Sequence, residues 1–179
     1  MADAGYPNGF KMTIHGPNDR YINDAKIAEA LAQMLNRVGI EASVETMPKA
    51  VYFKRASRGG PNKSPEFSFM LLGWGAGSGE ASSPLKALLH TYDKSKGLGA
   101  ANRGRHSDAE VDKLVQKALA TVDADARGAL LAKATERAVG VNYGVIPMHY
   151  QVNTWAAKKG YSYLPRTDER TIVTGLSGG

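Results

Sequence analysis

The N-terminal part of the sequence alternates between two kinds of hydrophobic spacing, and this alternation constrains the fold more than any other feature. From Lys11 to His15 every second residue is apolar, which is typical of a half-buried strand. Apolar residues then recur at the spacing of one helix face as far as Gly39, which suits a glycine just beyond a helix end. A second alternating stretch runs from Ala42 to Thr46 and stops before Pro48. Strand, helix and strand in this order predict a βαβ unit with parallel strands. The helical spacing is carried by Ile27, Leu31, Met34, Leu35 and Val38.

A nearly continuous apolar stretch, Phe67–Trp74, predicts a central strand that is covered on both faces. A short helix over 50–58 and a loop over 59–65 are expected before it. After it, a glycine-rich segment leads to Pro84, which suits the first turn of a helix that ends near His90.

The C-terminal half predicts two further helices after a loop over 91–106. Ser107 and Glu110 have the spacing of a capping box, in which the two side chains bond to each other's free backbone N–H groups. Asp123 or Asp125 is expected to cap the second helix. The remaining sequence predicts strands over 145–155, 161–164 and 171–173.

Composition excludes several functional classes. The chain has 179 residues, of which 42% are hydrophobic, and it has no cysteine. A chain of this length can bury a core without disulfides or a structural metal. The lack of cysteine excludes thiol catalysis and cysteine-based metal sites. The net charge of +6 comes from basic residues that are spread along the sequence, so we expect no nucleic-acid partner.

No catalytic, cofactor or metal motif is complete. The four histidines are far apart and lack metal-ligand spacing, so no metal site is expected. The glycines from Gly73 to Gly79 do not have the spacing of a dinucleotide-binding turn, and Ser78 lacks the flanking glycines of a nucleophile elbow. We therefore expect no catalytic residue and no cofactor. A free-standing α/β enzyme or nucleotide-binding domain stays open as the alternative.

Ligands of open α/β sheets bind outside the carboxyl ends of the strands. In this sequence the segments at that edge are His15–Asp24 and Trp74–Pro84. Glycines in the second segment allow close approach of a ligand, and Trp74 offers a large flat apolar face with one donor.

Five segments, in this order, resemble landmarks of a known family: Ala4–Phe10, the helix over Ile22–Val38 with the following Gly39–Val44, Phe67–Trp74, Asn102 through Ser107–Leu114, and Val145–Tyr150. The family is that of the large extracytoplasmic solute-binding proteins of ABC importers for dipeptides, oligopeptides, nickel and related solutes (extracellular solute-binding family 5).

The resemblance implies an α/β, periplasmic-binding-protein-like (type II) lobe, with a mixed β-sheet flanked by helices on both faces. Members have two lobes with the solute in the cleft between them. Residues 1–150 would be the distal ligand-binding lobe of such a protein, and 151–179 a return segment that packs on the absent first lobe. The expected function is capture of a peptide or similar small solute by hinge closure.

The resemblance also implies site residues, partners and a location. The expected ligand-binding residues are Trp74, Gly75, Ala76, Gly77, Asn18, Asn102, Arg105 and His149. Peptide-binding members use an aspartate near the strand-end tryptophan to hold the peptide α-amino group, and Gly77 occupies that position here. The expected partners are a small solute and, in the full-length protein, the cognate ABC permease. The isolated chain is also expected to self-associate through 151–174. The expected location is the periplasm, with a signal peptide in a missing N-terminal part.

Overall fold

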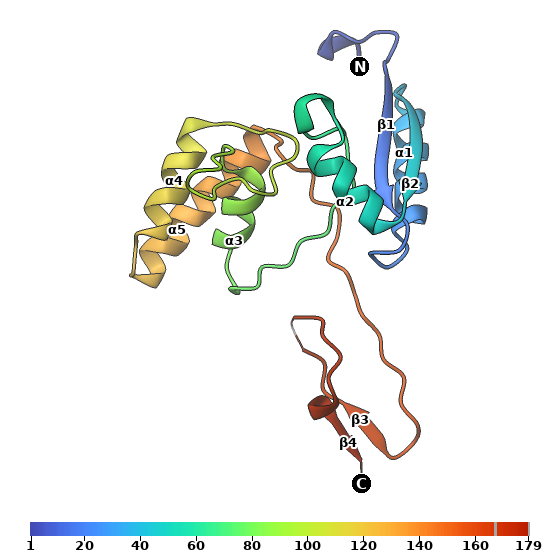
Figure 1. The fold of residues 1–179 in the computed structure, drawn as a ribbon, viewed down its shortest axis with the longest axis vertical. Helices are drawn as coiled ribbons and strands as arrows, with labels where there is room; N and C mark the ends of the chain where they lie inside the picture. The colour runs from blue at the N-terminus through green and yellow to red at the C-terminus, as the bar shows by residue number, and fades with distance from the viewer. Residues whose placement is uncertain (167, 179) are drawn as a thin grey trace. The chain divides into compact units, whose positions relative to one another are not determined.

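The computed structural model describes residues 1–166 and 168–178, and the chain forms two compact units, Met1–Val145 and Ile146–Gly179 (Figure 1). The boundary precedes by a few residues the one expected at 150. The assignment of 151–179 to an absent lobe stays a prediction.

The first unit contains the predicted βαβ unit. Strands β1 (Lys11–Pro17) and β2 (Glu41–Met47) are parallel, with Lys11 opposite Glu41 and Pro17 opposite Met47. Helix α1 (Asp24–Arg37) connects them. Gly39 follows α1 with a φ of +90°, a left-handed conformation that favours glycine, so the predicted helix end is confirmed. A short turn of helix, η1 (Ala2–Ala4), precedes the unit.

Each face of the β1–β2 pair is covered by a helix. On one face, Ile14 of β1 packs against Ala28 and Ala32 of α1. On the other face, helix α2 (Lys49–Arg58) buries Tyr52 and Ala56. The expected arrangement of helices on both faces is confirmed. The expected loop over 59–65 contains one further turn, η2 (Pro61–Lys63).

The prediction of a central strand over 67–74 is wrong. The segment pairs with β1 at a single point, where His15 donates its N–H to Phe69 O at 3.0 Å and accepts from Leu71 N–H at 2.8 Å. Strand β1 therefore lies between β2 and this short paired segment. Leu71 is buried by packing, and the chain leaves the sheet at Gly73, where the ring of Tyr21 lies alongside. The apolar residues of this segment are therefore explained by burial and not by pairing in an extended strand ladder.

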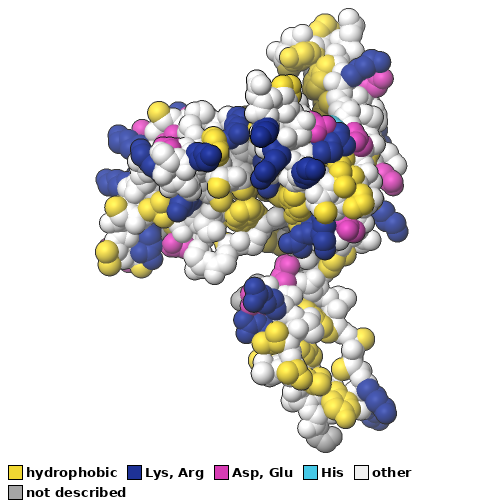
Figure 2. All heavy atoms as spheres, viewed as in Figure 1, with side chains coloured by type: hydrophobic (Ala, Val, Ile, Leu, Met, Phe, Trp, Pro, Cys, Tyr) yellow, Lys and Arg dark blue, Asp and Glu magenta, His cyan; other side chains and the backbone are white. Residues whose placement is uncertain are grey.

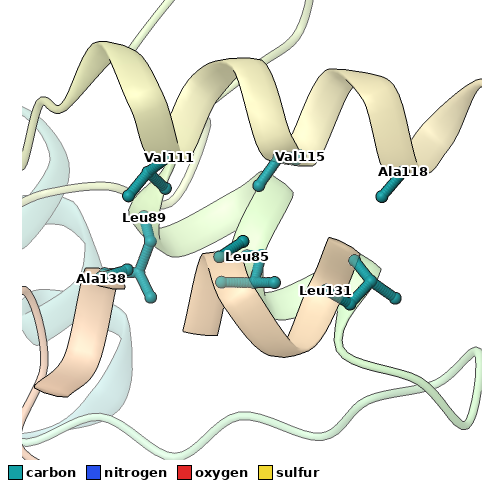
Figure 3. Close-up of a cluster of buried hydrophobic side chains, with 8 residues drawn as sticks. Leu85, Leu89, Val111, Val115, Ala118, Leu131 and Ala138 are labelled. Atoms are coloured by element: carbon teal, nitrogen blue, oxygen red, sulfur yellow. The ribbon is translucent and has the colours of Figure 1, made fainter. Parts of the chain in front are cut away.

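The rest of the first unit is helical. Helix α3 (Ser82–Pro84) continues into a wider turn, η3 (Leu85–Leu89), which confirms the predicted helix near Pro84. Helices α4 (Ala109–Leu119) and α5 (Ala124–Thr135) follow, and η4 (Glu136–Val141) extends α5. Figure 3 shows the side chains from η3, α4, α5 and η4 that meet in one buried cluster, among them Leu85, Leu89, Val111, Val115, Ala118, Leu131 and Ala138.

The predicted capping box at Ser107 is wrong, because the cap of α4 lies one residue later. The Asp108 carboxylate accepts from the N–H groups of Glu110 and Val111, both at 2.9 Å. The hydroxyl of Ser107 instead pairs with that of Thr91 at 2.8 Å. Asp123, one of the two predicted caps of α5, accepts from Ala126 N–H at 2.8 Å.

The second unit contains a small antiparallel hairpin. Strand β3 (Tyr161–Tyr163) pairs with β4 (Leu176–Gly178), and η5 (Val173–Gly175) lies directly before β4. The predicted strand over 161–164 is confirmed, whereas the one expected over 171–173 lies a few residues later. None of the described residues of 145–155 belongs to a strand, because these residues find no ladder partner. That prediction is also wrong.

Candidate functional site

The glycine loop, residues 73–79, begins where the short paired segment leaves the sheet. Trp74 is 45% exposed, and Gly75, Ala76 and Gly77 are exposed beside it. A Cβ atom added to Gly75 or Gly77 would meet nothing within 4 Å among the described residues. These four predicted site residues therefore form an accessible surface with open space around the backbone.

The loop after β1 touches the glycine loop. The hydroxyl of Tyr21 donates to Gly73 O at 3.2 Å, and a Cβ on Gly73 would lie 2.7 Å from the Tyr21 ring. Asn18 lies in the same connection, with its N–H donated to Met47 O at 3.0 Å and its side chain exposed. The structure thus joins the two segments that the sequence places at the carboxyl edge of the sheet.

Glu80, directly after the glycine loop, is held by its neighbours. Its carboxylate accepts from Ser82 Oγ at 2.7 Å and from Arg127 Nε at 2.9 Å. The hydrogen bond from Ser82, followed by that from Arg127, lowers the pKa of Glu80 below its usual range. Since this carboxylate already has two partners, it serves to connect the loop to α5.

A second concave surface, the basic pocket, lies in the same unit and has a volume of about 380 Å³. It is formed by the end of α2, the turn at η2 and the loop between η3 and α4. Figure 2 shows dark-blue basic side chains gathered over this part of the unit. The lining residues are Ser57, Arg58, Lys63, Pro65, Tyr92, Lys94, Ala100, Asn102, Arg103 and Arg105.

Two arginines of the basic pocket are fixed by neighbours. Arg103 donates from Nε to Ser57 Oγ at 3.1 Å, and its guanidinium lies 5.4 Å from the centre of the Phe53 ring. The Arg105 guanidinium lies 4.1 Å from the centre of the Tyr92 ring, a distance typical of cation–π stacking. These contacts hold both guanidinium groups in place without neutralising their positive charge.

Asn102 lines the basic pocket, but its amide is largely occupied. The side chain is only 3% exposed, and Nδ2 donates to His90 O at 2.9 Å and to His106 O at 2.7 Å. Its Oδ1 accepts from His106 N–H at 2.9 Å. Asn102 therefore holds together the two ends of the loop that carries Arg103 and Arg105. Its contact with a ligand stays a prediction.

His149 lies in the second unit and is exposed. The structure thus brings together Trp74, Gly75, Ala76 and Gly77, with Asn18 at the same edge of the sheet. Asn102 and Arg105 belong to the basic pocket. The ligand-binding role of all eight residues stays a prediction.

Four basic side chains of the pocket were not among the sequence candidates: Arg58, Lys63, Lys94 and Arg103. They come from two stretches of the sequence, 58–63 and 94–103, and within each stretch they are separated by other residues, so no local run of charge marks them. The spacing of Arg103 and Arg105 in one loop was the available signal.

A charged network ties α2 to the sheet. Arg55 donates from Nη1 to Glu45 at 2.5 Å and from Nε to Glu66 at 3.0 Å. These hydrogen bonds hold the pKa of both carboxyls below their usual range and raise that of Arg55. The His15 ring stacks on Phe67, with centroids 4.1 Å apart. The network connects β1, β2, α2 and the segment after η2.

Among the described residues, no three histidine or acidic side chains are grouped so that they could hold a metal ion. In the same part of the chain, no helix has the length and apolar character needed to cross a membrane.

Comparison with known proteins shows which solved structures share this fold. The solved structure of HbpA2 from Haemophilus parasuis superimposes with a TM-score of 0.77 over 99% of this chain and 34% of that protein, at 23% identity. The periplasmic binding protein DppA from Helicobacter pylori, in complex with the peptide STSA, aligns with a TM-score of 0.63 at 28% identity, over 75% of this chain and 24% of that protein. The predicted fold class is confirmed.

The chain belongs to the bacterial extracellular solute-binding proteins of family 5, since the model for the middle part of this family matches residues 1–96. Heme-binding protein A of Haemophilus influenzae is 28% identical over 140 residues, which are 75% of this chain and 23% of that protein. The chain spans about a quarter of the length of the curated relatives it matches. The family and these neighbours are binding proteins and not enzymes.

Proposed function

We propose that this chain is the distal lobe of the substrate-binding component of an ABC importer. The lobe would capture a peptide-like or other small solute in a cleft shared with a second lobe. Contacts from both lobes favour the closed state, so the solute itself drives hinge closure. No bond is made or broken in this mechanism, and no cofactor takes part.

The observation that carries this proposal is the exposed glycine loop at the carboxyl edge of the sheet. Trp74 offers an apolar face, and beside it the Gly75 N–H and the Gly77 C=O have no hydrogen-bond partner among the described residues, whereas the Gly77 N–H is donated to Gly75 O at 3.1 Å. Such a combination suits a solute with a peptide-like backbone, because the aromatic face orients it and the backbone groups bond to it. Family membership supports the same role.

The solute class is broader than dipeptides with a free α-amino group. Gly77 occupies the position where peptide-binding members have an aspartate, and Glu80 nearby is already bonded to Ser82 and Arg127. An ammonium group would therefore find no free carboxylate on this part of the loop. A relative that is named for heme binding, beside one that is crystallised with a peptide, supports this wider range.

Residues 151–179 would be the return segment toward the first lobe. In support, Ile146–Gly179 is a separate compact unit, and several of its large apolar side chains are exposed. An isolated chain that exposes such a surface would self-associate through 151–174. The apolar residues concerned include Trp155, Tyr161 and Leu164.

The expected partners in the cell are the solute and the permease of the same importer, and the expected location is the extracytoplasmic or periplasmic side of the membrane. The family description as extracellular solute-binding supports this location.

The test uses the full-length protein. Native mass spectrometry of the purified protein identifies any solute that co-purifies, and calorimetry then gives its Kd for the wild type and for Trp74→Ala. We expect at least tenfold weaker binding for Trp74→Ala, because a large aromatic contact is lost. Val122→Ala, at a side chain that is 92% exposed, is the control and should leave the Kd unchanged. Equal affinity of the wild type and Trp74→Ala would contradict a role for the glycine loop.

A further inference from the structure

The basic pocket concentrates positive charge that the protein itself does not neutralise. Five cationic side chains line it: Arg58, Lys63, Lys94, Arg103 and Arg105. Within the part of the chain that the structure describes, none of the five forms a salt bridge, and no carboxylate lines the pocket.

The acidic side chains next to the pocket are already engaged. Asp93 accepts from Ser95 Oγ at 2.6 Å and lies 3.7 Å from Lys96 Nζ. Glu66 accepts from Arg55. Neither carboxylate balances the charge of the lining residues, so an anion from solution is the remaining source of compensation.

A concave surface lined by one sign of charge focuses the electrostatic potential and raises the local concentration of counter-ions. The fixed guanidinium groups of Arg103 and Arg105 add directional donors, and such forks match the oxygen pairs of carboxylates and phosphates. The three other cations stand on exposed side chains that can adjust to a ligand. The pocket therefore has both a prearranged part and an adaptable part.

The size of the pocket restricts the ligand to a small molecule. A volume of about 380 Å³ lies at the lower end of the range for small-molecule sites. It is larger than one isolated oxyanion needs, and five positive charges favour a ligand with more than one negative group.

We propose that the basic pocket is a subsite for a small solute that carries two or more oxyanion groups, either carboxylates or phosphates. This inference deepens the proposed function and rests on it, since a bound anion is cargo only if the chain belongs to an importer. Binding of the anion itself needs only residues of the first unit, so it can be measured on the chain as it stands.

The experiment titrates the 179-residue chain with pyrophosphate and, separately, with the tricarboxylate tricarballylate, by calorimetry at constant ionic strength. We expect saturable one-to-one binding of at least one probe, and weaker binding as salt is raised. A double substitution, Arg58→Ala with Lys94→Ala, should weaken this binding at least about tenfold. The tighter probe assigns the site to phosphates or to carboxylates.

The matched control is Arg37→Ala with Lys133→Ala, which removes the same two charges from exposed positions on α1 and α5. It should keep the Kd within about twofold. Equal weakening by both double variants would overturn the inference, because the effect would then come from net charge alone. Absence of saturable binding for both probes would overturn it as well, whereas the proposed function would still stand if the full-length protein bound a neutral solute at Trp74.

Discussion

The hydroxyl of Tyr21 donates a hydrogen bond to the carbonyl oxygen of Gly73, 3.2 Å away, and thereby joins the connection after β1 to the start of the glycine loop. The aromatic ring lies so close that a Cβ atom at position 73 fits only if the ring or the loop moves. The position of Trp74, one residue later, therefore depends on the contact between Gly73 and Tyr21, which are distant from each other in the sequence.

Substitution Gly73→Ala tests this dependence. The new Cβ would lie 2.7 Å from Tyr21 Cε1, so the ring or the loop must move, and we expect a loss of about 1–3 kcal/mol in the free energy of unfolding. Denaturant unfolding measures the change. Gly75→Ala is the matched control and should cost much less, because its Cβ meets nothing within 4 Å. In a Tyr21→Ala background, Gly73→Ala should cost less than in the wild type, and an undiminished cost there would show that the contact is not the cause.

Substitution Asp108→Ala should lower the Tm of the chain by a few degrees, because the carboxylate caps α4 and also accepts from Arg137 Nη2 and Asn142 Nδ2, both at 2.8 Å. Differential scanning calorimetry is the measurement. Ser107→Ala, one residue earlier, removes only the bond to Thr91 and should have a smaller effect. A larger effect at Ser107 would restore the capping box that the sequence predicts.

Asp108 also predicts a dependence of stability on pH. The hydrogen bond from Arg137, with that from Val111 N–H, lowers the pKa of Asp108 below its ordinary value of 3.8. A carboxyl with a lowered folded-state pKa stabilises the fold above its unfolded-state pKa, and this contribution is lost as pH falls below about 4. As pH is lowered from 7 to 2, the free energy of unfolding should therefore decrease less steeply for Asp108→Asn than for the wild type. Parallel curves for the two proteins would contradict the linkage.

Substitution Tyr52→Phe tests a buried link between α2 and the paired segment. The Tyr52 hydroxyl donates to Leu71 O at 2.7 Å, and the phenyl ring of the variant would leave that carbonyl without this partner. We expect a loss of about 1–3 kcal/mol in unfolding free energy. Tyr143→Phe, at an exposed tyrosine, is the control and should change nothing measurable.

Local patterns predicted the parts of the fold whose partners are close in the sequence. The βαβ unit from Lys11 to Thr46 is one case, because each element is defined by its own spacing and by a terminating Gly39 or Pro48. The segment 67–74 is the opposite case. Its burial depends on His15 and Tyr52, which are far away in the sequence, and its apolar residues do not tell a packed loop from a strand.

The candidate site divides in the same way. The glycine loop was predictable, since it follows an apolar stretch and consists of small residues around Trp74. The basic pocket was not, because Arg58, Lys94 and Arg103 become neighbours only after folding. Because these basic residues are spread along the sequence, the sequence alone predicts an ordinary solvated surface for them. The cap at Asp108 was missed for a related reason, since Arg137 and Asn142 fix it from another helix and its end.

Arg55 gives the two candidate ligand surfaces a common mechanical support. Its bonds to Glu45 and Glu66 clamp α2 between β2 and the segment that leads to the glycine loop. Ser57 and Arg58, just beyond this clamp, form one wall of the basic pocket. Loss of these hydrogen bonds, as in Arg55→Leu, would thus loosen that wall of the pocket. It would also displace the segment that leads to Trp74, although Arg55 lines neither surface. If the protein closes about a hinge, the intact Arg55 contacts would make the two surfaces move together as a rigid body.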